Sequence, residues 1–387
     1  MEGPYRPERQ DASTSARIAV VCDGFLTYGG SERVVEAILR IHPHADLFAL
    51  VDFLPPHARG WLNGRQVRTS FLQHVPFARR HLRKLVALWP LAIEQFDFEG
   101  YDLVISVQFA VAHGVLTKPY QPHVAYISSP MRYAWDLQDD HLRQDGLAFG
   151  MLGFTTRRML HKLRMWDTLA GQRPDAIAAN SRFVAERVRK YYSRKGVVIY
   201  PPVFIDRFTY STEPRDFYLS LGRLVPHKRV DLIVEAFTRM TDLPLVVAGS
   251  GPMLKALRKR ATANITFVDE VSMPEADRLM GKARAYLHAA VEDFGITPVE
   301  AQATGTPVIA LGQGGLRETI VGAPATEPTG LFFDRQTPEA IVDAVRRFEA
   351  CRGSYSGEAC ARNAERFSER RFASEFRKLV REATGLS

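Results

Sequence analysis

The chain has 387 residues, of which 46% are hydrophobic and 24% charged, and its formal net charge is +8 at pH 7. This length suits two globular domains, and the lack of any apolar run of about 18 residues excludes a membrane-spanning helix from the expectations. Three scattered cysteines, Cys22, Cys351 and Cys360, fit a reducing cytosol and neither a disulfide framework nor a metal site. The basic charge favours an anionic partner, such as nucleic acid, acidic lipid or a phosphorylated ligand.

Residues 1–16 are polar, and we expect a mobile N-terminal segment there and not a secretory signal. After this segment, short apolar runs typical of buried parallel strands alternate with helical patterns. The first half of the chain predicts strands at 17–25, 45–51, 101–108, 123–129 and 174–181.

The stretch 77–96, FARRHLRKLVALWPLAIEQF, mixes the cations Arg79, Arg80, Arg83 and Lys84 with apolar residues. One interpretation is an amphipathic helix that packs against the core. The other is a peripheral contact with an anionic membrane surface, which would also account for the basic charge of the chain.

Two adjacent prolines within 196–208 indicate a linker. The second half then predicts strands at 217–224, 244–251, 265–271, 285–291, 307–314 and 330–334, and a closing helix at 368–385. We therefore predict two doubly wound α/β, Rossmann-like domains at 17–205 and 206–367, followed by a closing segment at 368–387. Ligands of such sheets bind beyond the carboxyl ends of the strands, so two facing domains predict a cleft.

The stretch EDFGITPVE, residues 292–300, carries two glutamates at the end of a predicted strand. Thr297 is predicted as an N-cap, with Pro298 at the first helical position. Glu300 would then complete a capping box, which gives it a purely structural explanation. Glu292 has no such explanation. The backbone N–H groups before the helix form a potential anion site.

Two further strand–helix junctions offer features that bind anions. In GRLVPHKR, residues 222–229, Arg223 ends a strand and Lys228 opens the next helix, a pair of cations that suits a diphosphate. In YGGSERVV, Gly29 and Gly30 would let the backbone approach a ligand closely. Ordinary surface cations and an ordinary turn are the alternative interpretations.

Taken together, these motifs resemble the retaining glycosyltransferases of family 4. The resemblance rests on YGGSERVV, GRLVPHKRVDLIVEAF, VVAGSGP, EDFGITPVEAQATGTPVIA and GQGGLRET, and it extends over nearly the whole chain from about residue 17. It implies the GT-B fold, in which two Rossmann-like domains hold a nucleotide sugar between them. The stretch YISSPMRYAWDL, residues 126–137, resembles a subgroup that often transfers mannose from GDP-mannose during surface polysaccharide assembly.

The resemblance also implies roles for individual residues. Glu300 would bind the ribose hydroxyls, Glu292 the donor sugar, and Arg223 and Lys228 the diphosphate. The remaining donor contacts would come from Gly29, Gly30, Val268, Val271, Phe294, Gly295, Ile296 and Thr297. Asp269 stands where relatives commonly have glycine in the loop that faces the base, which leaves the base contacts open.

Three residues are candidates for the side of the sugar or acceptor. His113 would end a strand and face the donor sugar, although a buried structural histidine fits equally well. Ser128 replaces a histidine that many relatives carry, and Arg132 could meet an acceptor phosphate or serve the fold instead.

The expected function is transfer of mannose from GDP-mannose to a lipid-linked glycan, at the cytosolic face of the inner membrane, with a UDP-sugar as the alternative donor. No cofactor or metal is expected, because cationic side chains and a helix end can stabilise the departing diphosphate. A dinucleotide-dependent oxidoreductase is a further alternative, although CDGFLTYGGSE lacks G-x-G-x-x-G spacing. A nucleic-acid-binding protein is a third, but the chain contains no recognisable binding module.

Overall fold

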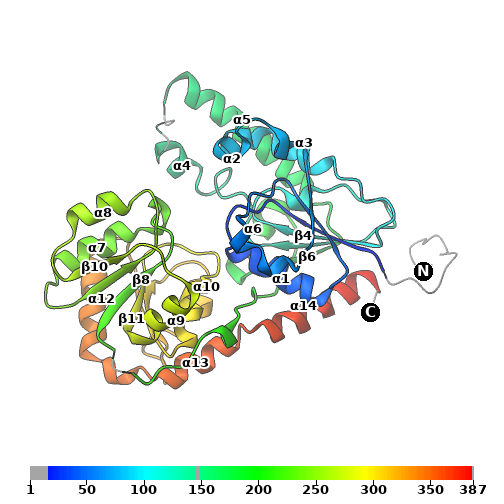
Figure 1. Ribbon diagram of the computed structural model, residues 1–387. Coiled ribbons are helices and arrows are strands. Elements are labelled where there is room, and N and C mark those ends of the chain that lie inside the picture. The colour runs from blue at the N-terminus through cyan, green and yellow to red at the C-terminus, as the bar shows by residue number, and fades with distance from the viewer. Residues whose placement is uncertain (1–15, 145, 147–148, 214, 386–387) are drawn as a thin grey trace. The chain divides into compact units, whose positions relative to one another are not determined.

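The computed structural model of the protein describes residues 16–144, 146, 149–213 and 215–385. Contacts divide the chain into two compact units (Figure 1). The N-terminal unit comprises Met1–Tyr200 and Ala373–Ser387, and the C-terminal unit comprises Pro201–Phe372. The division thus falls within the predicted linker, slightly before the expected boundary, and most of the closing helix groups with the N-terminal unit.

The sheet of the N-terminal unit is entirely parallel, with the order β3-β2-β1-β4-β5-β6-β7. Its strands are β1 (Ile18–Cys22), β2 (Asp46–Ala49), β3 (Val67–Thr69), β4 (Leu103–Gln108), β5 (His123–Ile127), β6 (Ala176–Ala179) and β7 (Val197–Val198). The sequence predicts five of these seven. It misses β3 and β7 because two or three residues are too few for a hydrophobic pattern.

Helices flank this sheet, and their bounds are α1 (Gly30–Ile41), α2 (Ala78–His81), α3 (Trp89–Glu94), α4 (Gln138–Gln144), α5 (Gly150–Ala170) and α6 (Arg182–Tyr192). The stretch 77–96 is not one amphipathic helix. Phe77 has a left-handed backbone (φ 58°), a 3₁₀ segment covers Leu82–Leu88, and Pro90 fits only the first turn of α3. Trp89 and Val86 are buried in the core of this unit.

The sheet of the C-terminal unit is also parallel, with the order β10-β9-β8-β11-β12-β13. Its strands are β8 (Phe217–Leu221), β9 (Leu245–Ala248), β10 (Ile265–Val268), β11 (Ala283–His288), β12 (Val308–Leu311) and β13 (Gly330–Phe333). The helices are α7 (Val230–Thr238), α8 (Leu254–Arg260), α9 (Met273–Lys282), α10 (Ile296–Ala303), α11 (Leu316–Thr319), α12 (Pro338–Ala350) and α13 (Gly357–Glu365). The long helix α14 (Glu369–Thr384) follows and continues into the N-terminal unit.

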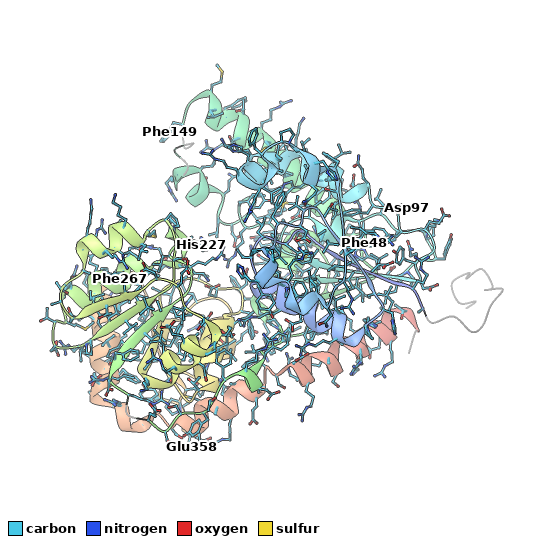
Figure 2. The ribbon with its side chains drawn as sticks, in the orientation of Figure 1. Phe48, Asp97, Phe149, His227, Phe267 and Glu358 are labelled. Carbon is cyan, nitrogen blue, oxygen red and sulfur yellow. The ribbon has the colours of Figure 1, made fainter. Side chains whose placement is uncertain are left out.

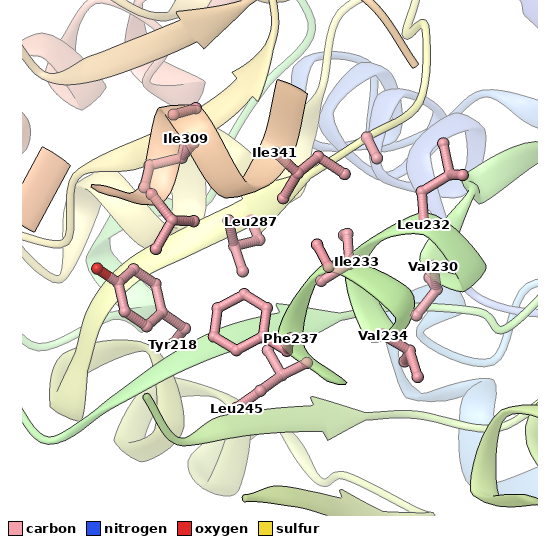
Figure 3. Close-up of a cluster of buried hydrophobic side chains, with 14 of the residues drawn as sticks. Tyr218, Val230, Leu232, Ile233, Val234, Phe237, Leu245, Leu287, Ile309 and Ile341 are labelled. Carbon is pink, nitrogen blue, oxygen red and sulfur yellow. The ribbon is translucent and has the colours of Figure 1, made fainter. Parts of the chain in front are cut away.

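Apolar residues at helical spacing fix α7 onto this second sheet. Ile233 and Phe237, one turn apart, are buried in a cluster with Tyr218, Leu287 and Ile341 (Figure 3). The rings of Tyr218 and Phe237 meet edge to face with centroids 5.3 Å apart. Burial of a side chain of this size stabilises the fold by about 1.5–3 kcal/mol, so the packing holds α7 and the loop before it in place.

In both sheets, the order in which successive strands are added switches from one side of the first strand to the other. The reversal lies between β1 and β4 in the N-terminal unit, and between β8 and β11 in the C-terminal unit. The two strands at a reversal send their connections to opposite sides, which leaves a crevice at their carboxyl ends. Each unit therefore offers one preferred position for a ligand.

Candidate functional site

In the C-terminal unit, three charged or titratable side chains meet at the reversal between β8 and β11. Lys228, from the loop after β8, donates to Oε1 of Glu292, from the loop after β11. The His288 Nε2 atom, at the end of β11, lies 3.0 Å from the same oxygen. The structure thus brings together two predicted site residues, Lys228 and Glu292, and adds His288, which no sequence motif indicates.

This cluster holds Glu292 as a carboxylate. Burial alone would raise the pKa of Glu292, but Lys228 and His288 outweigh burial and hold it well below its ordinary value. The side chain keeps 16% of its exposure. Within the described residues no hydrogen bond is formed by Oε2 of Glu292, so this oxygen can accept one from a ligand hydroxyl.

The loop after Glu292 enters α10 earlier than the sequence predicts. Gly295 is the N-cap, with φ 92°, and the helix begins at Ile296, so Thr297 and Pro298 already lie within its first turn. The predicted capping box of Thr297 and Glu300 is therefore wrong. Glycine permits this backbone, and any larger residue at position 295 would meet Leu316 Cδ2 at 2.4 Å.

The N-terminus of α10 carries no side-chain cap at Gly295. The first N–H groups of a helix lack intrahelical partners and sit at the positive end of its dipole. The backbone of Phe294, Gly295, Ile296 and Thr297 lies at this helix end, where the sequence predicts an anion site. The loop after β12 packs close beside it, because the Gly315 N–H donates to the Glu292 carbonyl at 2.8 Å.

Glu300 lies on α10, and its side chain is buried. Nearby, Tyr286 of β11 donates its hydroxyl to the Leu221 carbonyl at 2.8 Å. Burial, followed by the carboxylates of Glu292 and Glu300, raises the pKa of Tyr286. The phenol therefore stays protonated and ties β11 to β8 beneath the site.

Arg223 lies two residues after the end of β8, and its side chain is exposed. Within the part of the chain that the structure describes, no carboxylate pairs with it, in contrast to Lys228. The loop that carries Arg223 is held by glycines of the next loop: a Cβ at Gly249 would lie 2.1 Å from the Gly222 carbonyl, and one at Gly251 would lie 2.4 Å from the Leu224 carbonyl. Such contacts fix the backbone while leaving the guanidinium free to meet an anion.

Val268 and Val271, predicted near the base, are partly buried against an apolar cluster of the C-terminal unit. Asp269 between them is ion-paired with Arg258. The residue that departs from the family pattern therefore has a local partner on α8.

Gly29 and Gly30 lie at the start of α1, as predicted. Gly29 is the N-cap with an extended backbone, and its N–H donates to the Glu32 carboxylate at 3.0 Å. Glu32 is buried, so a carboxylate of the chain itself already accepts a hydrogen bond from the N-cap residue of this helix.

The acceptor-side candidates lie in different surroundings. His113 is fully buried, stacked on Tyr192 with centroids 5.4 Å apart, and its Nε2 atom is 3.3 Å from Asp167 Oδ1. This position matches the structural interpretation of His113 better than contact with a sugar. Ser128 is partly exposed just beyond β5, and Arg132 is partly exposed four residues later.

At the reversal of the N-terminal sheet, Asp23 fills the crevice from within. Its carboxylate accepts hydrogen bonds from the four consecutive N–H groups of residues 109–112, with N–O distances of 2.5–2.8 Å. Asp23 is buried. Backbone donors that could otherwise receive a bound anion are thus used by the protein itself.

No group of three or more His, Cys, Asp or Glu side chains among the described residues is arranged to hold a metal ion. None of their helices combines the length and the apolar character that crossing a membrane requires.

Comparison with known proteins places this geometry in context. Residues 204–367 match the family model described as glycosyl transferases group 1. A GDP-mannose-dependent alpha-(1-6)-phosphatidylinositol monomannoside mannosyltransferase of Mycobacterium tuberculosis is 33% identical over 156 residues, which cover 36% of this chain and 40% of that protein. The chain thus spans about two fifths of the length of this curated relative.

Solved structures match nearly the full chain at low identity. A sucrose-phosphate synthase from Thermosynechococcus elongatus has a TM-score of 0.71 at 18% identity, covering 96% of this chain and 100% of its own. Anabaena HepE in complex with UDP has a TM-score of 0.64 at 17% identity, covering 95% and 100%. These matches confirm the predicted GT-B fold with two Rossmann-like units.

Proposed function

We propose, from the match of residues 204–367 to the glycosyl transferases group 1 family model, that the chain is a retaining glycosyltransferase, which moves mannose from GDP-mannose to a lipid-linked glycan in polysaccharide biosynthesis. One observation carries the proposal. Lys228 and His288 hold the Glu292 carboxylate at the β8/β11 reversal, beside the exposed Arg223 and the uncapped N-terminus of α10.

Each group has a distinct task in the proposed reaction. Arg223, Lys228 and the N–H groups of residues 294–297 bind the diphosphate and stabilise the negative charge that grows on it as it departs. Glu292 accepts a hydrogen bond from a sugar hydroxyl and faces the cation that develops on the sugar. Glu300 binds the ribose. The proposal needs neither a metal nor a cofactor, since the positive charge comes from the protein.

The donor is proposed from relatives and not from contacts. The mycobacterial relative is named for GDP-mannose, which favours a guanine nucleotide, whereas the structural match HepE is a complex with UDP. A UDP-sugar remains the alternative donor. We propose that the Asp269–Arg258 pair, in the loop expected to face the base, affects the choice between guanine and uracil. The oxidoreductase alternative receives no support from the comparisons.

We further propose that the N-terminal unit contacts an anionic membrane through the segment 77–96, at the cytosolic face of the inner membrane. Arg79, Arg80 and Lys84 are exposed on this segment, while Leu82, Val86 and Trp89 are buried. The exposed cations fit electrostatic attraction to acidic lipid, and Phe77 and Leu91 of the same segment are exposed as well.

A direct experiment tests the donor proposal. The purified chain is titrated calorimetrically with GDP, UDP and NAD, and then assayed with GDP-mannose and a panel of UDP-sugars, with and without a chelator. We expect selective binding of GDP, hydrolysis or transfer from GDP-mannose, and no loss of activity in chelator. Binding of NAD alone would overturn the proposal, and activity that magnesium restores after chelation would overturn its metal-free form.

A further inference from the structure

The first turns of α5 carry an unusual set of exposed apolar side chains. Phe149, at the N-cap, is 91% exposed, and Met151, Leu152 and Phe154 are 85%, 66% and 68% exposed. Figure 2 labels Phe149 at the outer edge of the N-terminal unit. Contiguous large apolar side chains of this kind usually mark an interaction site.

Charge along the helix indicates which partner this apolar tip, residues 149–154, would meet. No Asp or Glu occurs between residues 146 and 166. Arg158 and Lys162 are exposed about two and three turns after Met151, on the same side of α5 and about 10 Å and 16 Å further along its axis. Along the helix axis, the exposed apolar residues of the first turns are therefore followed by cations, and these in turn by the exposed Met165 and Leu169.

This order matches the layers of an anionic bilayer. Apolar side chains of interfacial helices reach about 5–10 Å past the headgroups, and cations stay beside the lipid phosphates. A protein groove would instead select a stripe that continues along one face, yet here the stripe is interrupted by Arg158 and Lys162.

The rest of α5 is firmly attached to its unit. Leu160 and Leu163 are buried in the same core cluster as Leu82 and Val86 of the segment 77–96. Trp166 Nε1 donates to Glu94 Oε1 at 2.8 Å, which joins α5 to α3. The tip is thus the exposed end of a helix whose remainder packs against the core. The same core cluster includes residues of the basic segment.

We infer that residues 149–154 insert into the interface of an anionic membrane, while Arg158 and Lys162 contact lipid phosphates. This inference rests on the proposed membrane-facing function and adds a second apolar contact to the one that Phe77 and Leu91 of the basic segment offer. The occupant is lipid, and not a second copy of the chain or another protein.

The test compares three variants by co-sedimentation with phosphatidylcholine vesicles containing or lacking phosphatidylglycerol. The tip variant Met151→Ser/Leu152→Ser/Phe154→Ser should lose vesicle binding by about tenfold or more, since each buried methylene adds to membrane affinity. The matched control, Met165→Ser/Leu169→Ser, changes exposed apolar residues of the same helix beyond the cations and should bind normally. Reversal of Arg79, Arg80 and Lys84 to Glu should remove only the preference for phosphatidylglycerol.

A fluorophore on the tip reports whether it enters the bilayer, which co-sedimentation does not measure. Cys351 is the exposed cysteine, so Phe154→Cys in a Cys351→Ser background can carry an environment-sensitive fluorophore. We expect a blue shift on addition of anionic vesicles. Unchanged binding of the tip variant, or equal losses for tip and control, would overturn the inference. A tip variant that changes the sedimentation coefficient instead would identify a second copy as the partner and also overturn it.

Failure of this inference can be told apart from failure of the proposed function. The tip lies in the N-terminal unit, so the tip variant should hydrolyse GDP-mannose in vesicle-free buffer at the wild-type rate. Loss of vesicle binding with intact hydrolysis supports both proposals. Vesicle binding through the tip by a chain that never turns over a nucleotide sugar would reject the glycosyltransferase and keep the membrane contact.

Discussion

The two sheets share one topology but use their reversal points in opposite ways. Between β1 and β4, Asp23 is buried and its carboxylate is fully satisfied by four backbone N–H groups. Between β8 and β11, Glu292 shares a cluster with Lys228 and His288, and Arg223 nearby is exposed. Topology supplies a crevice in both units. The side chains decide whether it is closed by the protein or left for a ligand.

The largest effect is expected at the closed crevice. Asp23→Asn replaces one acceptor oxygen by a donor, so about two of the four buried N–H groups lose their partner, at about 1–3 kcal/mol each. We expect the N-terminal unit to lose about 4 kcal/mol of stability. All four tryptophans lie in this unit, so urea unfolding followed by tryptophan fluorescence measures the loss.

Hydrogen exchange keeps that prediction testable if Asp23→Asn unfolds too readily for equilibrium measurements. The amides of residues 109–112 should exchange much faster in the variant, while β11 keeps its protection. Equal protection of these amides in both proteins would show that Asp23 does not close the crevice.

At the open crevice, Glu292→Gln should act on turnover. We expect kcat to fall by about a hundredfold, the scale of removing one preorganised polar group, while affinity for free GDP stays nearly unchanged because the sugar is absent. Transfer kinetics and calorimetry on the same preparation decide. His288→Asn is the companion variant, and its smaller loss would separate the positioning of Glu292 from its charge.

Acid should destabilise the N-terminal unit before the C-terminal unit. Burial lowers the pKa of His123, next to Ser106 in the N-terminal sheet, to about 3. The unfolded chain takes up this proton near pH 6.5, so stability falls as the pH drops below that value. By pH 5 the loss is about 2 kcal/mol.

Glu292 behaves differently, because its lowered pKa keeps it ionised in the folded state and its contribution is lost only below about pH 4.5. Tryptophan-detected urea midpoints at pH 7.5 and pH 5, repeated on His123→Gln, check the difference. A variant with the same pH dependence as the wild type would remove His123 from the explanation.

The last prediction concerns the affinity for free nucleotide of two groups proposed to contact it. Glu300→Gln and Arg223→Ala should each weaken GDP binding by about 1–3 kcal/mol, the value of a hydrogen bond to a charged group. Arg223→Ala should alter stability by less than about 0.5 kcal/mol, because its side chain is exposed. If both variants bound GDP normally, the assignment of the donor site would be wrong.

Sequence patterns predict most residues of the candidate site, because these residues stand at strand ends. Arg223 and Lys228 follow one apolar run and Glu292 follows another, and parallel strands bring such ends to one edge. The same patterns do not indicate His288, because it stands inside the apolar run and looks like a buried strand residue. His288 stands four residues before Glu292, and this spacing alone does not predict that the two side chains meet. Their contact depends on the path of the loop after β11.

Other details depended on backbone geometry that no local pattern reveals. The sequence placed the cap of α10 at Thr297, whereas the left-handed Gly295 starts the helix earlier. Asp23 was overlooked because its four partners lie far along the chain, at residues 109–112. The segment 77–96 satisfies a helical pattern, yet Phe77 and Pro90 divide it.

The path of the chain between the units has a consequence for synthesis on the ribosome. The C-terminal unit is a single insertion, and its entry and exit run side by side, where the Val203 N–H donates to the Phe367 carbonyl at 2.9 Å. Residues 373–387 belong to the N-terminal unit but are translated after the whole insertion. The unit that begins first is therefore completed last, and a nascent chain can finish folding its second sheet while the first still awaits Phe376 and Leu379 of α14.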